Sequence, residues 1–122
     1  MNPEPRIVTS AENSTSGHSI TSDETSFGGA SHRYSVRWEN EHYVGSNGIH
    51  FQTGPVKEHG HNGVTAEDLL EIVADRLFCF QAGPFACDEN AEALSHVASA
   101  LAAMNSRTAK RRDRGVEGTT AK

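Results

Sequence analysis

A stripe of apolar residues at helical spacing predicts an amphipathic helix over 65–81. The members of the stripe are Leu69, Ile72, Val73 and Leu77. Thr65 stands where its hydroxyl can cap the first turn, and Asp68 follows three residues later, where its carboxylate can accept from the Thr65 backbone N–H. The helix therefore carries its own start signal.

A second, longer helix is predicted over 86–114, because apolar residues continue at the same spacing. They are Leu94, Val97, Ala98, Leu101 and Met104, with the small residues Ala91, Ala98 and Ala102 expected to permit close approach. Gly83-Pro84 separates the helices, since glycine accepts a left-handed cap and proline cannot continue a helix. The pair forms an antiparallel hairpin whose second helix, at about 43 Å, overhangs its partner.

Alternating polarity predicts strands earlier in the chain. Tyr34, Val36 and Trp38 alternate with polar residues, the period of a half-buried strand. Asn47-Gly48 is typical of a two-residue hairpin turn, since both positions of a type I′ turn need positive φ. We therefore expect an antiparallel β-meander over 32–56 that ends at Gly54-Pro55.

Residues 1–31 are rich in Ser, Thr, Asn and Gly and predict a flexible N-terminal arm, with at most a short strand near Ile20. Residues 57–63 read as a loop. The predicted fold is α+β: one domain over 32–120, made of a small antiparallel sheet packed on a long helical hairpin, with a tail at 115–122.

Charge is unevenly distributed along the chain. Residues 107–122 hold six basic and two acidic side chains, whereas the preceding residues hold five basic and 14 acidic ones. Arg107 with Arg111, and Lys110 with Arg114, are like charges one helical turn apart, which an anionic ligand would offset. The alternative for Lys110, Arg111 and Arg112 is that they only complement the negative end of the helix dipole, whereas Arg107 lies a turn or two deeper in the helix.

Chemistry-bearing residues are sparse. No apolar run has the length of a signal peptide or a membrane span, so we expect a cytoplasmic protein in which Cys79 and Cys87 are free thiols. His50, His59 and His61 lack partners at zinc spacing. No phosphate loop or nucleophile motif stands out, so the sequence predicts neither an enzyme, a metal site nor a cofactor.

Four segments resemble a phage family, the Thoeris anti-defence sponges, which share their hairpin domain with anti-CBASS sponges. They are IHFQTGPVK (49–57), GVTAEDLL (63–70), DRLFCFQAGPFACDEN (75–90) and RTAKRRDRGVEGT (107–119). Members of the family sequester cyclic ADP-ribose isomers made by bacterial TIR-domain enzymes and do not cleave them. The resemblance covers roughly residues 34–120 and implies the same sheet-and-hairpin fold.

The resemblance also implies site residues. Phe80 matches the aromatic that stacks on adenine, Asn90 a nearby polar contact, and Arg107 the arginine that engages phosphates. Arg111 and a basic strand residue complete the pocket, and for the strand residue Arg37 is preferred over Arg33. The alternative for Phe80, as for Phe78 and Phe85 beside it, is an ordinary core position.

A second pocket for cyclic di- or trinucleotides is implied at Lys57, Arg114, Gly115 and Thr119. The sequence departs from the family there and nearby, because Ala103 replaces a common aromatic and Thr120 a common histidine.

Asn90 and Arg107 are about 25 Å apart along one helix, too far for one small ligand within one protomer. The pocket is therefore expected to join two antiparallel chains of a homodimer, which some family members assemble into hexamers. The expected function is a non-enzymatic sponge in the cytoplasm of the infected host. The alternatives are a phage protein that binds nucleic acid through 107–114, which its net acidity disfavours, and a nucleotide-cleaving enzyme that uses His50 or His61.

Overall fold

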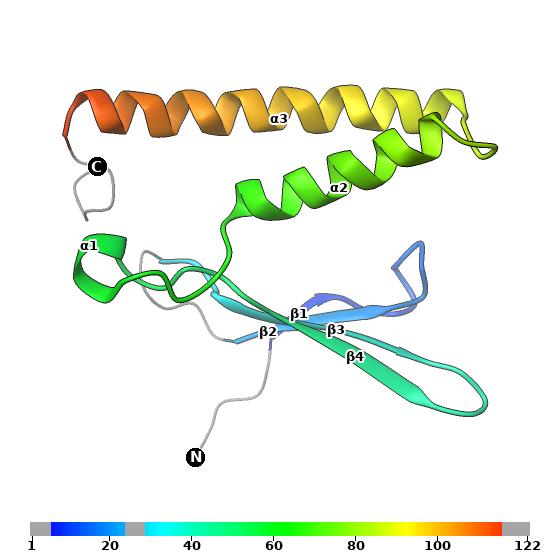
Figure 1. Ribbon diagram of the computed structural model, residues 1–122. Helices are drawn as coiled ribbons and strands as arrows, with labels where there is room; N and C mark the ends of the chain where they lie inside the picture. Colours follow the sequence, from blue (N-terminus) through cyan, green and yellow to red (C-terminus); the bar gives the residue numbers. More distant parts are fainter. Residues whose placement is uncertain (1–5, 24–28, 116–122) are drawn as a thin grey trace, which may run out of the picture. The chain divides into compact units, whose positions relative to one another are not determined.

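A four-stranded antiparallel sheet forms in the first half of the chain, and Figure 1 shows each strand beside the next. The computed structural model describes residues 6–23 and 29–115. The strands are β1 (Arg6–Thr9), β2 (Ser19–Ser22), β3 (Arg33–Glu39) and β4 (Val44–His50). The predicted alternation in β3 is confirmed, since Tyr34 pairs with Ile49 and Val36 with Ile20, so that apolar residues share one face.

The turn between β3 and β4 lies at residues 40–43, and the prediction of a turn at Asn47-Gly48 is wrong. Asn47 and Gly48 lie inside β4, and neither has a positive φ. The Asn40 side-chain oxygen accepts from the backbone N–H groups of His42, at 2.8 Å, and Tyr43, at 3.1 Å. An Asx turn therefore forms earlier than the Asn-Gly pair, and it leaves β4 long enough to pair along the whole of β3.

The expected flexible arm contributes two strands to the sheet. The short strand predicted near Ile20 is confirmed by β2, whereas β1 was not predicted and corrects the expectation for its residues. Ile7 and Val8 in β1 are exposed, so this strand shows little apolar periodicity. The Arg6 side chain links β1 to the segment before β3, because Arg6 Nη2 donates to Oγ of the buried Ser31 at 3.2 Å.

A short helix, α1 (Val56–His59), replaces the first part of the loop predicted at 57–63. The Gln52 side chain donates to the carbonyls of Gly54, at 3.2 Å, and Gly60, at 2.8 Å, so both ends of this helix are tied to one amide. The chain then returns to the end of β4, where the Val64 backbone N–H donates to the His50 carbonyl at 2.8 Å.

Gly63 lies where this return is tightest. A Cβ added there would stand 2.5 Å from the Phe51 carbonyl carbon and 2.7 Å from the His50 carbonyl oxygen, both backbone atoms. We expect Gly63→Ala to lower the free energy of unfolding by about 3 kcal/mol, measured by urea denaturation. Gly48→Ala is the matched control, because its nearest atom would lie 3.9 Å away. Equal losses in both variants would contradict the steric argument.

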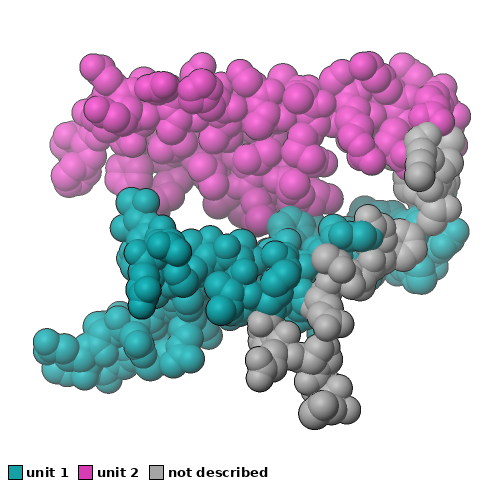
Figure 2. Space-filling model, turned by 180° about the vertical axis from the view of Figure 1, so that it is seen from behind, with its two compact units in different colours: residues 1–64 teal, residues 65–122 magenta. Residues whose placement is uncertain are grey.

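The chain divides into two compact units, Met1–Val64 and Thr65–Lys122, which Figure 2 colours separately. The first holds the sheet and α1, and the second holds the helices α2 (Ala66–Gln81) and α3 (Asp88–Asp113). This element content confirms the predicted α+β class. The packing of the sheet on the hairpin and the single domain over 32–120 stay predictions.

The predicted helical hairpin is confirmed in the second unit (Figure 1). The Asp68 backbone N–H donates to Thr65 Oγ1 at 3.1 Å, and the Thr65 backbone N–H donates to Asp68 Oδ2 at 2.9 Å, so the expected capping box is present. Helix α3 begins at Asp88 rather than at the predicted Ala86. None of the helices in the described part of the chain is long and apolar enough to span a membrane.

The predicted apolar stripes are confirmed where their residues are buried or half-buried, at Leu69, Leu77, Leu94, Val97, Leu101 and Met104, but other predicted positions are exposed. In α2, Ile72 and Val73 are exposed, while Ala74 and Leu77 are half-buried. In α3 the predicted close-approach residues Ala91, Ala98 and Ala102 are all exposed. The more buried positions follow a heptad-like spacing at Asn90, Ala93, Leu94, Val97, Leu101, Met104, Thr108 and Arg111. Polar residues thus continue the inner face of α3 beyond its apolar part at both ends.

Candidate functional site

Four basic side chains line a groove on the C-terminal half of α3. Its volume is about 540 Å³, and it is lined by Ala103, Ser106, Arg107, Lys110, Arg111 and Arg114. The cations repeat at intervals of three and four residues, which places them on adjoining rows of one helix surface. The structure therefore brings together Arg107 and Arg111, predicted for the first pocket, with Arg114, predicted for the second.

The groove lies on the part of α3 that extends beyond the length of α2. With 26 residues, α3 is about 39 Å long, whereas α2, with 16 residues, is about 24 Å long. Arg107 is exposed, and Arg111 is half-buried on the inner face of the helix. Part of this charge is accounted for by the helix dipole, since Lys110, Arg111 and Arg112 occupy the last turn. Arg107 lies one turn earlier, where the dipole contributes least.

The opposite end of the hairpin is aromatic. Phe80 is half-buried in the last turn of α2, and its ring meets the Phe85 ring edge-on, with centroids 6.4 Å apart. The Arg76 guanidinium carbon lies 5.0 Å from the centroid of Phe80. A cation over one face and an aromatic edge beside it restrict the orientation of this ring. Phe80 is therefore neither a fully buried core residue nor a freely rotating surface one.

Arg76 is a residue that the sequence reasoning missed. The available signal was its position four residues before Phe80, which places the two side chains on the same helix face.

Side chains also fix the turn that follows Phe80. The Cys87 backbone N–H donates to Gln81 Oε1 at 3.0 Å, which joins the end of α2 to the start of α3. The Cys87 thiol in turn caps α3, because its sulfur accepts from the Asn90 backbone N–H at 3.4 Å. Gly83 does not have the left-handed conformation predicted for it, and the turn closes by an Ala86 N–H donating to the Gly83 carbonyl. Asn90 is thereby held in the first turn of α3.

The remaining predicted site residues lie elsewhere. Arg37 is in β3 and forms an exposed ion pair with Glu39 at 3.8 Å, and Lys57 is in α1. Gly115 follows the end of α3 with a φ of 72°, a left-handed conformation that suits glycine. Thr119 and Thr120 lie outside the described residues. Arg114 and Gly115 are therefore adjacent at the end of α3, and the second pocket stays a prediction.

Across residues 6–23 and 29–115, no three His, Cys, Asp or Glu side chains are grouped so as to hold a metal ion. Cys79 and Cys87 are free and exposed, as expected. His50 ends β4, and His61 is exposed in the loop after α1.

Comparison with known proteins places this hairpin in a family. The family described as "Acb2/Tad1, hairpin domain" matches residues 47–109, which contain α2 and most of α3. A protein of Bacillus phage SBSphiJ7 named Thoeris anti-defense 1 is 54% identical over 71 residues, which make up 58% of this chain and 50% of that relative. The alignment therefore spans about half the length of the relative. Because the family match covers half of the chain, this protein belongs to the Acb2/Tad1 hairpin-domain family, which confirms the resemblance seen in its sequence.

Proposed function

We propose that this protein is a phage anti-defence sponge, which binds cyclic ADP-ribose isomers in the cytoplasm of the infected bacterium without cleaving them. The observation that carries the proposal is the groove lined by four cations on α3. At the other end of the same hairpin is the ring of Phe80, with the Arg76 guanidinium over one face. The family membership and the printed name of the phage relative support the anti-defence role.

The chemistry of the ligand suits the two ends of the hairpin. Cyclic ADP-ribose carries adenine, a planar base, and a pyrophosphate with two negative charges. An aromatic face such as that of Phe80 contributes about 1 to 3 kcal/mol per stacked base. A planar guanidinium such as that of Arg107 donates two parallel hydrogen bonds to phosphate oxygens, and Arg111 adds charge in the same groove. Asn90, beside the turn, offers an amide for the ribose or base.

The two ends of the hairpin in one protomer lie too far apart to contact the same ligand molecule. Asn90 and Arg107 lie on the same helix, 17 residues apart, and are therefore separated by about 25 Å. A second chain, antiparallel to the first, would place its Arg107 beside the Phe80 and Asn90 of its partner. A C2 dimer then has two equal pockets.

The exposed apolar surface of the hairpin supports such a dimer. Ile72 is 63% exposed, Phe78 64% and Phe85 72%. Within the described hairpin, Leu101 is the one buried hydrophobic side chain, so two helices alone bury little apolar area. A second copy would cover part of this surface, and dimers could assemble further into hexamers.

Calorimetry with a panel of cyclic ADP-ribose isomers tests the proposal. We expect one ligand per protomer, and we expect the ligand to be recovered intact after the complex is heated and analysed by mass spectrometry. Recovery of linear ADP-ribose would make the protein an enzyme instead. Salt-sensitive binding to a DNA duplex, with no binding of any cyclic ADP-ribose isomer, would favour the nucleic-acid alternative. In that case the same cations would contact the DNA phosphates.

Three predicted residues are part of the proposal without a described position at the pocket. Arg37 would complete the first pocket from the sheet. Lys57 and Thr119, with Arg114 and Gly115, would bind a cyclic di- or trinucleotide at the second pocket. Native mass spectrometry with both ligand classes would show whether the two occupancies are independent.

A further inference from the structure

Strand β4 lies at one end of the sheet, and its outer edge is open. Within the part of the chain that the structure describes, β3 is the one strand that pairs with it. The backbone hydrogen bonds to β3 alternate along this ladder, beginning with the Phe51 N–H that donates to the His32 carbonyl at 2.7 Å. The exposed residues whose N–H and C=O groups therefore point away from the sheet are Val44, Ser46 and Gly48.

The two edges of the sheet differ in how they are protected. The other edge strand, β1, has four residues, begins with the charged Arg6 and has an irregular register between Ile7 and Thr9. Short length, charge and bulges are the usual devices that prevent an edge from pairing with another chain. Strand β4 has seven residues, and residues 43–49 include no proline and no Lys, Arg, Asp or Glu. A further strand can therefore be added at β4.

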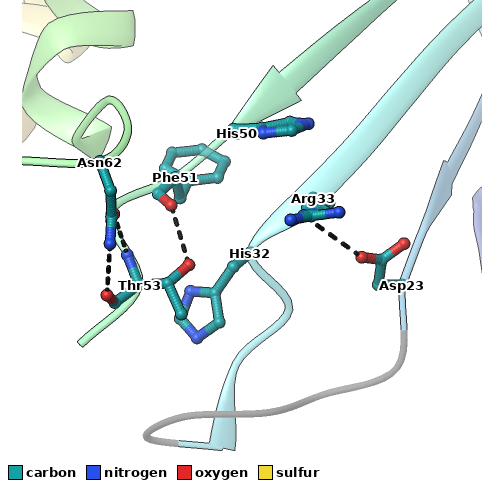
Figure 3. A pocket seen from close by; sticks show the side chains of 7 residues that line it. All are labelled: Asp23, His32, Arg33, His50, Phe51, Thr53 and Asn62. Carbon is teal, nitrogen blue, oxygen red and sulfur yellow. Dashed lines mark hydrogen bonds and ion pairs between the residues drawn. The ribbon is translucent and has the colours of Figure 1, made fainter. Parts of the chain in front are cut away.

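The chain itself closes both ends of this open edge. After β4 the returning chain occupies the edge, since the Val64 N–H donates to the His50 carbonyl at 2.8 Å. Beyond it, the Asn62 side chain accepts from the Thr53 N–H and donates to the Thr53 carbonyl, both at 2.8 Å (Figure 3). At the start of β4, the Asx turn formed by Asn40 ends the strand. The edge that a partner can pair with is therefore 44–48.

A second copy of this edge fits the first in an antiparallel arrangement with a twofold axis at Ser46. Ser46 then lies opposite Ser46 of the partner subunit, and Val44 lies opposite Gly48 of the partner subunit. All the outward-pointing residues exchange both of their backbone hydrogen bonds in this register. The Val44 side chain, which is 55% exposed, meets a residue without a side chain. The edge is therefore complementary to itself.

The same register brings two apolar side chains together on the other face of the sheet. Tyr43, which is 59% exposed, lies opposite Ile49 of the partner subunit, and Ile49 is on the apolar face with Tyr34. An aromatic residue opposite a β-branched one is a stabilising cross-strand pair, and the symmetry forms it twice. A shift of the partner by two residues in either direction loses this pair and shortens the ladder.

From the open row of backbone groups, its closed ends and its self-complementary register, we infer that β4 pairs with β4 of a second copy of this chain. The two sheets then form one continuous antiparallel sheet. The contact is isologous and occupies the same edge in both chains, so it closes at two subunits. It is separate from the proposed pairing of hairpins, which uses the second unit. A chain that makes both contacts assembles beyond a dimer.

Oxidative cross-linking of a Ser46→Cys variant tests the contact. The full chain is used with Cys79→Ser and Cys87→Ser, which remove the exposed thiols. Opposite residues of a hydrogen-bonded pair have Cα atoms about 5.5 Å apart, which a disulfide can span. We expect two chains to be linked at least about tenfold faster than in the control Ser19→Cys, which places the thiol on the inner strand β2. Equal rates in the two variants would overturn the inference.

Charge at the twofold axis gives a second, reversible test. Ser46→Glu places a carboxylate opposite Arg37 of its own sheet, but in the pair two carboxylates face each other across the axis. Ser46→Lys places two ammonium groups there. In native mass spectrometry we expect each variant alone to form smaller assemblies than the parent chain, through loss of this contact, and a mixture of the two to recover the parent mass.

Ser19→Glu is the matched control, because it places the same carboxylate opposite Arg37 from β2, away from the open edge. It should keep the parent assembly. A parent-sized assembly of Ser46→Glu, or a mixture of Ser46→Glu and Ser46→Lys that stays small, would overturn the inference. Neither experiment contains a ligand, so its outcome is independent of the proposed binding of cyclic ADP-ribose isomers.

Discussion

Replacing Arg107 with alanine is expected to weaken the binding of a cyclic ADP-ribose isomer by about 100-fold in calorimetry. The guanidinium is the cation of the groove that the helix dipole accounts for least, since it precedes the last turn of α3. Removing one partner from a desolvated phosphate pair costs about 2 to 5 kcal/mol, because the other charge is left without a counterpart. Arg107→Lys should lose about tenfold, since a point charge cannot form both hydrogen bonds.

Arg112→Ala is the control for this prediction. It removes the same charge from the same helix, and its position is outside the set of residues that line the groove. We expect the affinity for the cyclic ADP-ribose isomer to stay within about twofold of that of the parent chain, because salt screens an exposed charge that lies outside the groove. An equal loss in both variants would show that the groove attracts the ligand only by its total charge.

A mixture of two inactive variants is expected to recover binding. Phe80→Ala lacks the stacking ring and Arg107→Ala lacks the phosphate contact, so each variant alone should bind poorly. If every pocket combines Phe80 of one chain with Arg107 of another, a mixed dimer contains one intact pocket and one doubly defective pocket. Random refolding of equal amounts should therefore restore about one quarter of the pockets at full affinity.

Calorimetric stoichiometry measures this recovery directly. A pocket confined to one protomer would give no high-affinity sites in the mixture, and the dimer proposal would then be abandoned. Refolding Phe80→Ala together with the doubly substituted chain is the control, since no dimer of those two chains contains an intact Phe80. It should remain without high-affinity sites.

The helical hairpin was the most predictable part of the fold. Its first helix is specified locally by Thr65 and Asp68, and the structure shows both hydrogen bonds of that capping box. Local signals of this kind need no tertiary context. The inner faces were less predictable, because Ile72 and Val73 match helical spacing as well as Ala74 and Leu77 do. Which side of a helix is buried depends on the element that packs against it.

The sheet shows why local signals can mislead. Asn47-Gly48 has a stronger intrinsic preference for a hairpin turn than the residues at 40–43, yet it lies within β4. There the longer ladder includes Trp38 opposite Gly45, whose missing side chain leaves room for the indole. A Cβ at Gly45 would lie 2.5 Å from that ring. Cross-strand packing of this kind is invisible in a single segment of sequence.

The candidate site residues and their sharing between two chains stay predictions, and the structure adds how some of their side chains are arranged. Arg107 and Arg111 do share a groove, whereas the contribution of Arg76 depends on where its guanidinium lies relative to Phe80. The neighbourhood of Arg33 and His50 had no sequence signal, because these residues are paired only through the register of β3 with β4. Residues that strand pairing brings together can lie far apart in the sequence, and they then form no motif.

The two faces of α3 have different tolerances to change. Its inner face repeats with a heptad spacing and contains Leu101, whereas Arg107 and Lys110 are exposed on neighbouring rows. Substitutions on those rows can alter the shape and charge of the groove without disturbing the helix pair. Arg111 is the exception, since it belongs to both faces. The exposed rows of α3 therefore determine the chemistry of the groove, whereas its inner face determines how the two helices pack.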